Sequence, residues 1–146
     1  MKRKKKSKLQ KRKEDRSSTY WKKMADTAWA TFIKLRDGCC VIGRSQEGFI
    51  DPCNGHLEAA HLISRAVLLH RHEPMNGITL CSKHHKWSNL LSAHATPLAF
   101  AEWLRLNHAN HWEWHEHNKW KRASVKPDFK LAHEILTRRI SEIKSS

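Results

Sequence analysis

The sequence predicts an α+β fold that is mostly helical, with a two-stranded hairpin and one short helix as a small core between flanking helices. Apolar side chains recur at helical spacing near both ends of the chain. Helical periodicity disappears in a central stretch from residue 39 to residue 63, and a short segment after it again has helical character. No apolar run approaches the ~20 residues that cross a bilayer, so we expect no membrane span.

The first flanking helix is predicted over residues 19–36. Its apolar positions follow the spacing of one helix face, and Gly38 supplies a stop. These apolar residues are Tyr20, Trp21, Met24, Ala28, Trp29, Phe32, Ile33 and Leu35. We expect this amphipathic helix to pack on the core.

Two short strands are predicted in the central stretch, at Cys39–Ile42 and His56–Ile63. The polar loop between them contains Asn54-Gly55, a pair typical of turns. Residues 64–77 are expected to form a loop. A short helix is expected to begin around Cys81.

Helices are also predicted toward the C-terminus. Pro97 opens one of them, because the missing N–H of proline costs nothing in the first helical turn. Pro127-Asp128 begins a final helix with an apolar stripe on one face. The His- and Trp-rich stretch 108–122 receives no assignment, and its tryptophans fit either a core face or a surface that stacks on bases.

The chain is strongly basic, with a net charge of +14 when histidine is counted as neutral. Ten of the 28 Lys and Arg residues lie in the first sixteen positions beside two acidic residues, so this tail carries +8 and the rest +6. We predict a disordered tail over residues 1–17 and a single domain over residues 18–146. A field of this sign favours polyanions such as DNA, although a solubilising tail has the same composition.

The basic N-terminus has no apolar stretch behind it, so it does not predict a secretory signal, and the expected localisation is cytoplasmic. In such a chain, four cysteines beside histidines indicate thiols or metal ligands rather than disulfides. Twelve histidines are an unusual number, and we expect several of them to be ligands or catalysts.

Three short motifs stand in order in the middle of the chain. His61 ends an apolar stretch, Asn76 precedes a second one, and His84-His85 completes a Cys-x-x-His-His pattern that begins at Cys81. Hydrolysis of a phosphodiester requires a base that deprotonates water and a divalent ion that stabilises charge on the phosphate. Histidine suits the first task because its pKa lies near neutrality.

These motifs resemble those of the HNH endonucleases, a family of the ββα-metal class with many phage-encoded members. The similar residues are Ala-His-Leu-Ile around His61, Asn-Gly-Ile-Thr-Leu-Cys from Asn76 and Lys-His-His-Lys around His85. The resemblance covers residues 30–105. It implies a metal-dependent DNA endonuclease that uses Mg²⁺ or Mn²⁺ and, if phage-encoded, acts in the cytoplasm of a bacterial host.

The resemblance also implies a role for each motif residue. His61 would be the general base that activates the attacking water. Asn76 would hold the loop and orient the base through hydrogen bonds, or would reach the metal itself. His85 would coordinate the catalytic ion.

One position departs from the family pattern. Many members have an aspartate immediately before the first histidine as a second metal ligand, whereas this chain has Ala60. Glu58 points to the same face of the predicted strand as Ala60 and is one substitute, although an exposed strand residue would look the same. His94, nine positions past His85, is another.

The cysteines predict a second, structural metal. In many family members a Cys-x-x-Cys pair precedes the first histidine and another precedes the last, but here the first pair has Gly43 where its second cysteine would be. Cys53 lies later in the same loop and is the expected substitute for this missing cysteine. A tetrahedral zinc site of one imidazole and three sulfurs is therefore predicted. Its ligands are Cys40, Cys53, Cys81 and His84. Cys39 is an alternative to Cys40, and buried apolar cysteines without metal are the competing interpretation.

Basic residues near the motifs are candidates for gripping phosphates, although each is also explained as a solvated charge. They are Arg44, Arg65, Arg71, Lys83 and Lys86. The expected partner is DNA, without a membrane, for a monomer or homodimer. Two other hypotheses remain: a zinc-containing DNA-binding module with reduced catalysis, for which Ala60 argues, and a basic DNA packaging or assembly factor.

Overall fold

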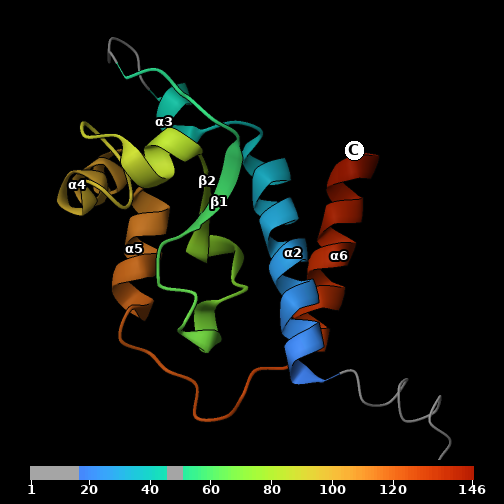
Figure 1. Cartoon of the computed structure of the whole chain (residues 1–146). Coiled ribbons are helices and arrows are strands. Elements are labelled where there is room, and N and C mark those ends of the chain that lie inside the picture. The colour runs from blue at the N-terminus through green and yellow to red at the C-terminus, as the bar shows by residue number, and fades with distance from the viewer. Residues whose placement is uncertain (1–16, 46–50) are drawn as a thin grey trace, which may run out of the picture.

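The structure is a computed structural model that describes residues 17–45 and 51–146. Helices dominate it, and two antiparallel strands form its sheet, which confirms the predicted α+β class (Figure 1). The predicted basic tail lies outside the described residues except for Ser17. Within the described ranges, every helix is too short or too polar to cross a membrane.

Helix α2 (Ser18–Asp37) confirms the first predicted helix. The Ser17 hydroxyl accepts the N–H of Tyr20 at 3.3 Å, which caps the start. Gly38 ends the helix in the left-handed conformation, with φ of 73°, where a side chain would be strained. The buried face carries Ala25, Ala28, Trp29, Phe32 and Ile33. Most of this face packs on α6 (Phe129–Ser145) through Leu136.

The strand predicted at Cys39–Ile42 is wrong. This stretch instead leads into α3 (Val41–Arg44), one helical turn in which Arg44 N–H donates to the carbonyl of Cys40 at 3.0 Å. An apolar run of only four residues has no periodicity that distinguishes strand from helix. The turn also buries Cys40 beside His84, another predicted zinc ligand, with 3.5 Å between Sγ and Nδ1.

The hairpin pairs β1 (Leu57–His61) with β2 (Gly77–Cys81), and His61 lies opposite Gly77. The first of these strands was predicted at His56–Ile63, but the second was missed. All five residues of β2 are buried, so the strand shows no alternation of apolar and polar side chains. The expected loop forms the connection, with the 3₁₀ turns η1 (Leu68–His70) and η2 (Pro74–Asn76) within it.

A single π-helical turn, η3 (Lys83–Trp87), follows β2 and carries His84 and His85, so the predicted short helix is present. Helix α4 (Pro97–Asn107) starts at its proline as expected. The unassigned stretch forms α5 (Ala109–Asn118). The last predicted helix is α6, capped by the Asp128 carboxylate, which accepts Leu131 N–H at 3.0 Å.

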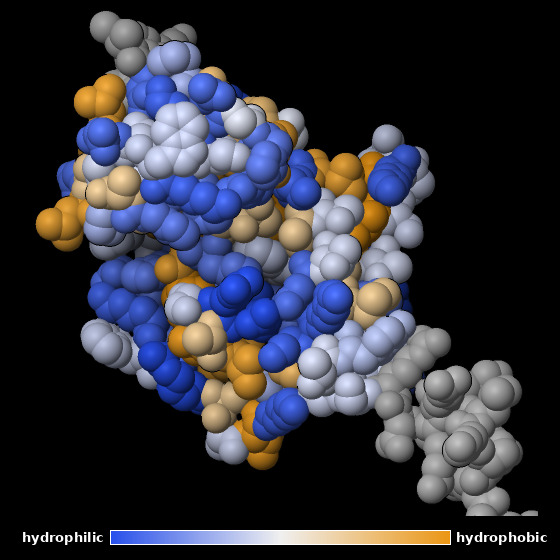
Figure 2. Space-filling view, viewed as in Figure 1, coloured by the Kyte–Doolittle hydropathy of each residue, from blue (hydrophilic) through white to orange (hydrophobic). Residues whose placement is uncertain are grey.

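The hairpin lies between two groups of helices, with α2 and α6 side by side on one side and α4 and α5 on the other (Figure 1). One buried cluster joins β2 and α3 to α4, and the other joins α2 to α6. Hydrophilic side chains gather over the middle of the visible face, where the hairpin and the connection between its strands lie (Figure 2). The two predicted histidines, His61 and His85, are placed at this central hairpin.

Candidate functional site

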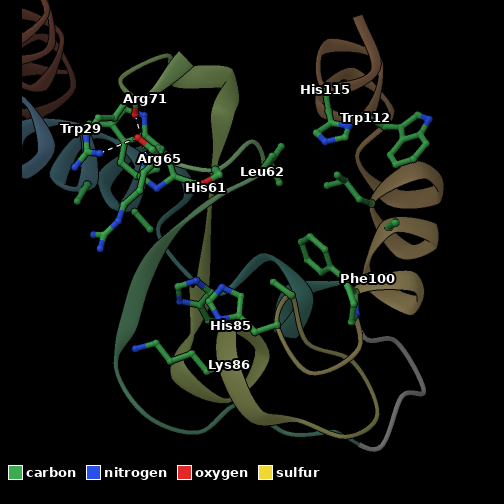
Figure 3. A pocket seen from close by; sticks show the side chains of 18 of the residues that line it. Trp29, His61, Leu62, Arg65, Arg71, His85, Lys86, Phe100, Trp112 and His115 are labelled. Atoms are coloured by element: carbon green, nitrogen blue, oxygen red, sulfur yellow. Dashed lines mark hydrogen bonds between the residues drawn. The ribbon is translucent and has the colours of Figure 1, made fainter. Parts of the chain in front are cut away.

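A pocket of about 950 Å³ lies between the hairpin and helices α2, α4 and α5. His61 and Leu62 line one side, His85 and Lys86 line another, and aromatic side chains of α4 and α5 face them (Figure 3). The pocket therefore brings together the first and last histidines of the predicted motif, which are 24 positions apart in the sequence.

His61 has a defined tautomer. Its Nε2 lies 2.9 Å from the carbonyl oxygen of Arg71. Because a carbonyl only accepts, Nε2 must carry the proton and Nδ1 must hold the lone pair. Burial lowers the pKa of His61, although the hydrogen bond to Arg71 acts in the opposite direction. A neutral imidazole with a free basic nitrogen is the state that a general base requires.

Asn76 is fully buried and all of its side-chain hydrogen bonds go to the hairpin connection. Its Oδ1 accepts Ile63 N–H at 2.6 Å, and its Nδ2 donates to the carbonyls of Ile63 and His70 at 3.0 and 2.9 Å. The residue after His70 is Arg71, whose carbonyl binds His61. The geometry thus gives Asn76 the loop-holding arrangement.

Replacing Asn76 with alanine is expected to lower the free energy of unfolding by about 3–5 kcal/mol, because three buried backbone groups lose their partner. Urea unfolding of both proteins measures this difference. Asn107→Ala is the control, since that exposed amide donates only to Trp103 within its own helix. An equal loss in the two variants would contradict the special role of Asn76.

His85 has the opposite tautomer to His61. Its Nδ1 lies 2.6 Å from Glu58 Oε2, and Lys86 Nζ and His56 Nε2 bind the other oxygen of this carboxylate at 2.8 and 3.1 Å. Burial raises the pKa of Glu58, but the hydrogen bonds from Lys86 and His85 outweigh it and hold the pKa at about 2. The ionised carboxylate only accepts, so His85 donates from Nδ1 and keeps a lone pair on Nε2.

His94 lies beside His85, as one of the two predicted substitutes for the missing aspartate. The backbone N–H of His94 donates to the carbonyl of His85 at 3.0 Å, and their ring centroids are 4.6 Å apart. Both rings line the pocket. Glu58 accepts the hydrogen bond of His85 Nδ1 and is not among the residues that line the pocket. The buried neighbour Ala60 offers no ligand atom.

The four predicted zinc ligands meet in one cluster. Within residues 17–45 and 51–146, they are the group of His, Cys and acidic side chains whose ligand atoms all lie within 4.8 Å of one another. His84 Nδ1 lies 3.5, 3.8 and 3.2 Å from the sulfurs of Cys40, Cys53 and Cys81. Tetrahedral Zn²⁺ with Zn–S of about 2.3 Å and Zn–N of about 2.0 Å requires S···N separations of roughly 3.5 Å. The donor set therefore fits zinc.

A buried carboxylate stands behind this cluster. Asp51 Oδ2 lies 3.2 Å from His84 Nε2, and Ser88 and Lys83 bind the same carboxylate. Burial opposes ionisation, but the bonds from Lys83 and Ser88 lower the pKa of Asp51 overall. An ionised Asp51 places the proton of His84 on Nε2 and leaves Nδ1 directed to the sulfurs, as in many zinc sites.

Gly43 explains how Cys53 replaces the expected cysteine of the degraded pair. A Cβ at residue 43 would collide with the sulfur of Cys53 and would lie 4.0 Å from that of Cys40. The space that a side chain at 43 would occupy is thus filled by the Cys53 thiol from the following loop. Burial and the neighbouring thiols raise the pKa of Cys53 to about 12, so thiolate formation here requires a cation.

Three of the five predicted phosphate-binding residues, Arg65, Arg71 and Lys86, line the pocket. The guanidinium of Arg71 is paired with Asp26. Lys83 instead pairs with Asp51, and Arg44 donates to the carbonyl of Asp37 at 3.2 Å, so neither lines the pocket.

The structure adds three residues that the motif pattern did not single out. Asp51 supports the cysteine cluster, and Asp26 and Trp29 of α2 contact the His61 region. The helical spacing of Trp29 predicts a core residue, and Trp29 is indeed buried in addition to its contact with His61. A short sequence pattern contains no signal for contacts between a core helix and a distant loop.

Residues 39–89 match the HNH endonuclease family model. The match contains β1, β2, η3 and every predicted ligand and motif residue except His94, and it covers about a third of the chain. No match was found among curated proteins or among solved structures. We call the matched residues 39–89 the HNH segment. Helices α2, α4, α5 and α6 lie outside it.

Proposed function

We propose that this protein is a metal-dependent endonuclease that hydrolyses phosphodiester bonds of DNA. The observation that carries the proposal is the pair of histidines in one pocket, His61 with its lone pair on Nδ1 and His85 with its lone pair on Nε2. A general base and a metal ligand each need one unprotonated ring nitrogen, and the hydrogen bonds of the two rings leave one on each. The HNH family match and the net charge of +14 support a nucleic acid as substrate.

In the proposed reaction, His61 removes a proton from a water molecule through Nδ1. The resulting hydroxide attacks phosphorus, and the bond from phosphorus to the leaving oxygen breaks. The Arg71 carbonyl keeps the proton on Nε2 and thereby holds His61 in the required tautomer. Arg65 and Lys86, which line the same pocket, neutralise charge on the phosphate.

His85 and His94 are the pocket residues that would hold the catalytic ion, with Glu58 fixing the orientation of His85. A divalent ion there would stabilise negative charge on the scissile phosphate and the leaving oxygen. Imidazole donors suit transition ions, whereas Mg²⁺ prefers oxygen ligands. Mg²⁺, Mn²⁺ and Ni²⁺ should therefore be compared directly.

A structural zinc ion held by the cysteine cluster completes the proposal. Its ligands are Cys40, Cys53, Cys81 and His84, with Asp51 behind the imidazole. These ligands come from the residue before α3, the loop before β1, the end of β2, and η3. Zinc would therefore fasten η3, which carries His85, to the rest of the segment.

Glu58→Gln is expected to raise the metal concentration for half-maximal cleavage by about 10-fold to 100-fold, the range typical of outer-shell partners of a ligating histidine. The neutral amide loses the charge that holds the proton on Nδ1 of His85. The measurement is a titration of the cleavage rate with Mn²⁺. Glu102→Gln is the matched control, because Glu102 pairs with Arg105 on the exposed face of α4. Identical titrations for the two variants would contradict this role.

The substrate class is tested with labelled oligonucleotides: duplex DNA, single-stranded DNA and RNA of one sequence. Each is incubated with the protein and Mg²⁺, Mn²⁺ or Ni²⁺, with and without EDTA. The proposal predicts cleavage of DNA that EDTA stops. Binding of DNA without cleavage under all metals would instead support the DNA-binding module or the packaging factor, and cleavage of RNA alone would overturn DNA as the substrate.

A further inference from the structure

Helix α2 contacts the proposed base although it lies outside the HNH segment. The indole of Trp29 stacks on His61 with ring centroids 3.9 Å apart and planes 14° from parallel (Figure 3). Trp29 is 2% exposed, and its Nε1 donates to the carbonyl of Glu73 at 2.9 Å. The indole of Trp29 therefore contacts His61 through its face, and the hydrogen bond to Glu73 fixes its edge.

Gly77 leaves the room that this stack occupies. It lies opposite His61 in the hairpin, and a Cβ added to it would collide with the indole of Trp29. The extended backbone of Gly77 would accept other residues, since its φ is −141°. Space, and not backbone conformation, is what this glycine supplies.

A second residue of α2, Asp26, binds Arg71, whose carbonyl accepts from His61. The two oxygens of Asp26 accept from Arg71 Nε and Nη2 at 2.6 and 2.7 Å, and His72 Nε2 lies 2.7 Å from Oδ1. Arg71 also donates to the carbonyl of Arg65 at 2.7 Å. Paired hydrogen bonds of this kind fix both position and orientation. They fix the residue whose carbonyl accepts the Nε2 proton of His61.

We infer that Trp29 and Asp26 are positioning residues for His61, with Trp29 setting the plane of the imidazole and Asp26 setting the carbonyl that selects its tautomer. This inference rests on the proposed function. It assigns to a helix outside the HNH segment the task of aligning the base. Small misplacements of a reacting group of about 1 Å can lower a rate by about 100-fold.

The inference predicts changes in kcat with little change in KM, because Trp29 is buried with its Nε1 donating to Glu73, and the carboxylate of Asp26 binds Arg71 and His72. Trp29→Phe, Trp29→Leu and Asp26→Asn are each expected to lower kcat by about 10-fold to 100-fold. Asp26→Glu should restore part of the rate, since it keeps a carboxylate for Arg71. Phe32→Leu is the matched control: it truncates another buried aromatic of α2 that does not line the pocket. It should leave kcat within about twofold.

The pH profile separates positioning from general stability. The charged and titratable groups that act on His61 are Arg71, Asp26 and His72. The same pocket is also lined by Arg65, His85, Lys86, His94 and His115. Trp29→Leu admits water to the imidazole and should move the acid limb of the kcat profile to higher pH. Phe32→Leu should leave the limb in place. Equal shifts in both variants would overturn the inference.

A double-mutant cycle with His61→Ala makes the test independent of folding losses. If Trp29 and Asp26 act through His61, their substitutions should cost nothing further in the His61→Ala background. The same loss in both backgrounds would overturn the inference while leaving the base assignment intact. If His61→Ala itself cleaves like the wild type, the proposed function fails instead.

NMR of the imidazole nitrogens gives a readout that needs no activity and applies to any variant that folds. In the wild type, His61 should show protonated Nε2 and unprotonated Nδ1. Asp26→Asn should mix the two tautomers, whereas Phe32→Leu should not. A single unchanged tautomer in Asp26→Asn would contradict the role of that residue.

Discussion

Replacing His61 with alanine is expected to lower the single-turnover rate of DNA cleavage by roughly 10²–10⁴-fold, the contribution typical of a general base. The variant lacks the nitrogen that accepts the proton of water, while the pocket keeps Arg65, Lys86 and His85. DNA binding should therefore change little. The measurement is the cleavage rate with enzyme in excess over a labelled DNA, together with the dissociation constant for the same DNA.

The wild-type rate should depend on pH through this residue. Only neutral His61 accepts a proton, so the rate rises as the imidazole loses its charge. Burial lowers the pKa of His61 below its ordinary value of about 6.5, so the midpoint of the rise should lie below pH 6.5 with a plateau above it. His117→Ala removes an exposed histidine of α5 and should preserve both rate and profile. A midpoint above pH 6.5 would contradict the buried neutral base.

Removing the structural metal is expected to have the largest effect on folding. A well-formed zinc site contributes about 10–16 kcal/mol, which equals or exceeds the ~5–15 kcal/mol net stability of ordinary domains. Cys81→Ser should lose the metal and unfold at least the segment around η3. Metal analysis of protein purified without added metal, with thermal unfolding before and after a strong chelator, measures both effects.

Cys39→Ser is the matched control for this prediction. Cys39 is adjacent to Cys40 in sequence but does not belong to the four-ligand cluster, so its substitution should retain about one equivalent of zinc and the same unfolding temperature. Zinc affinity should weaken as the pH is lowered, because the Cys53 thiol, whose pKa is raised to about 12, must lose its proton to bind. A folded, metal-free wild-type protein that a chelator does not affect would contradict the zinc site.

The helices could be predicted from the sequence more completely than the strands. Helix α2 and helix α6 each carry an apolar stripe and a cap that belong to the segment itself. Strand β2 has no such pattern, because both of its faces are covered and its residues are uniformly buried. The segment Cys39–Ile42 was misassigned as a strand for a related reason: an apolar run of four residues is compatible with a strand or a helix.

The cluster of three cysteines and His84 could be predicted from residue type, order and resemblance, whereas the role of His61 as the base stays a prediction. Cys53 was identified as the substitute for the cysteine missing at Gly43, and the geometry places it there. Supporting residues could not be predicted in this way. Asp51 and Asp26 act through hydrogen bonds to residues 33 and 45 positions away, which depend on the folded arrangement. Their side chains look like ordinary surface charges in the sequence.

Incubation of supercoiled plasmid with the wild-type protein and with His61→Ala, purified side by side, tests the central claim most directly. Each is assayed with Mg²⁺, Mn²⁺ and Ni²⁺ and with EDTA. The account predicts that the wild type relaxes or linearises the plasmid with at least one of these metals, that EDTA stops it, and that His61→Ala leaves the plasmid supercoiled. An intact plasmid with every metal, or equal cleavage by the two proteins, would contradict it.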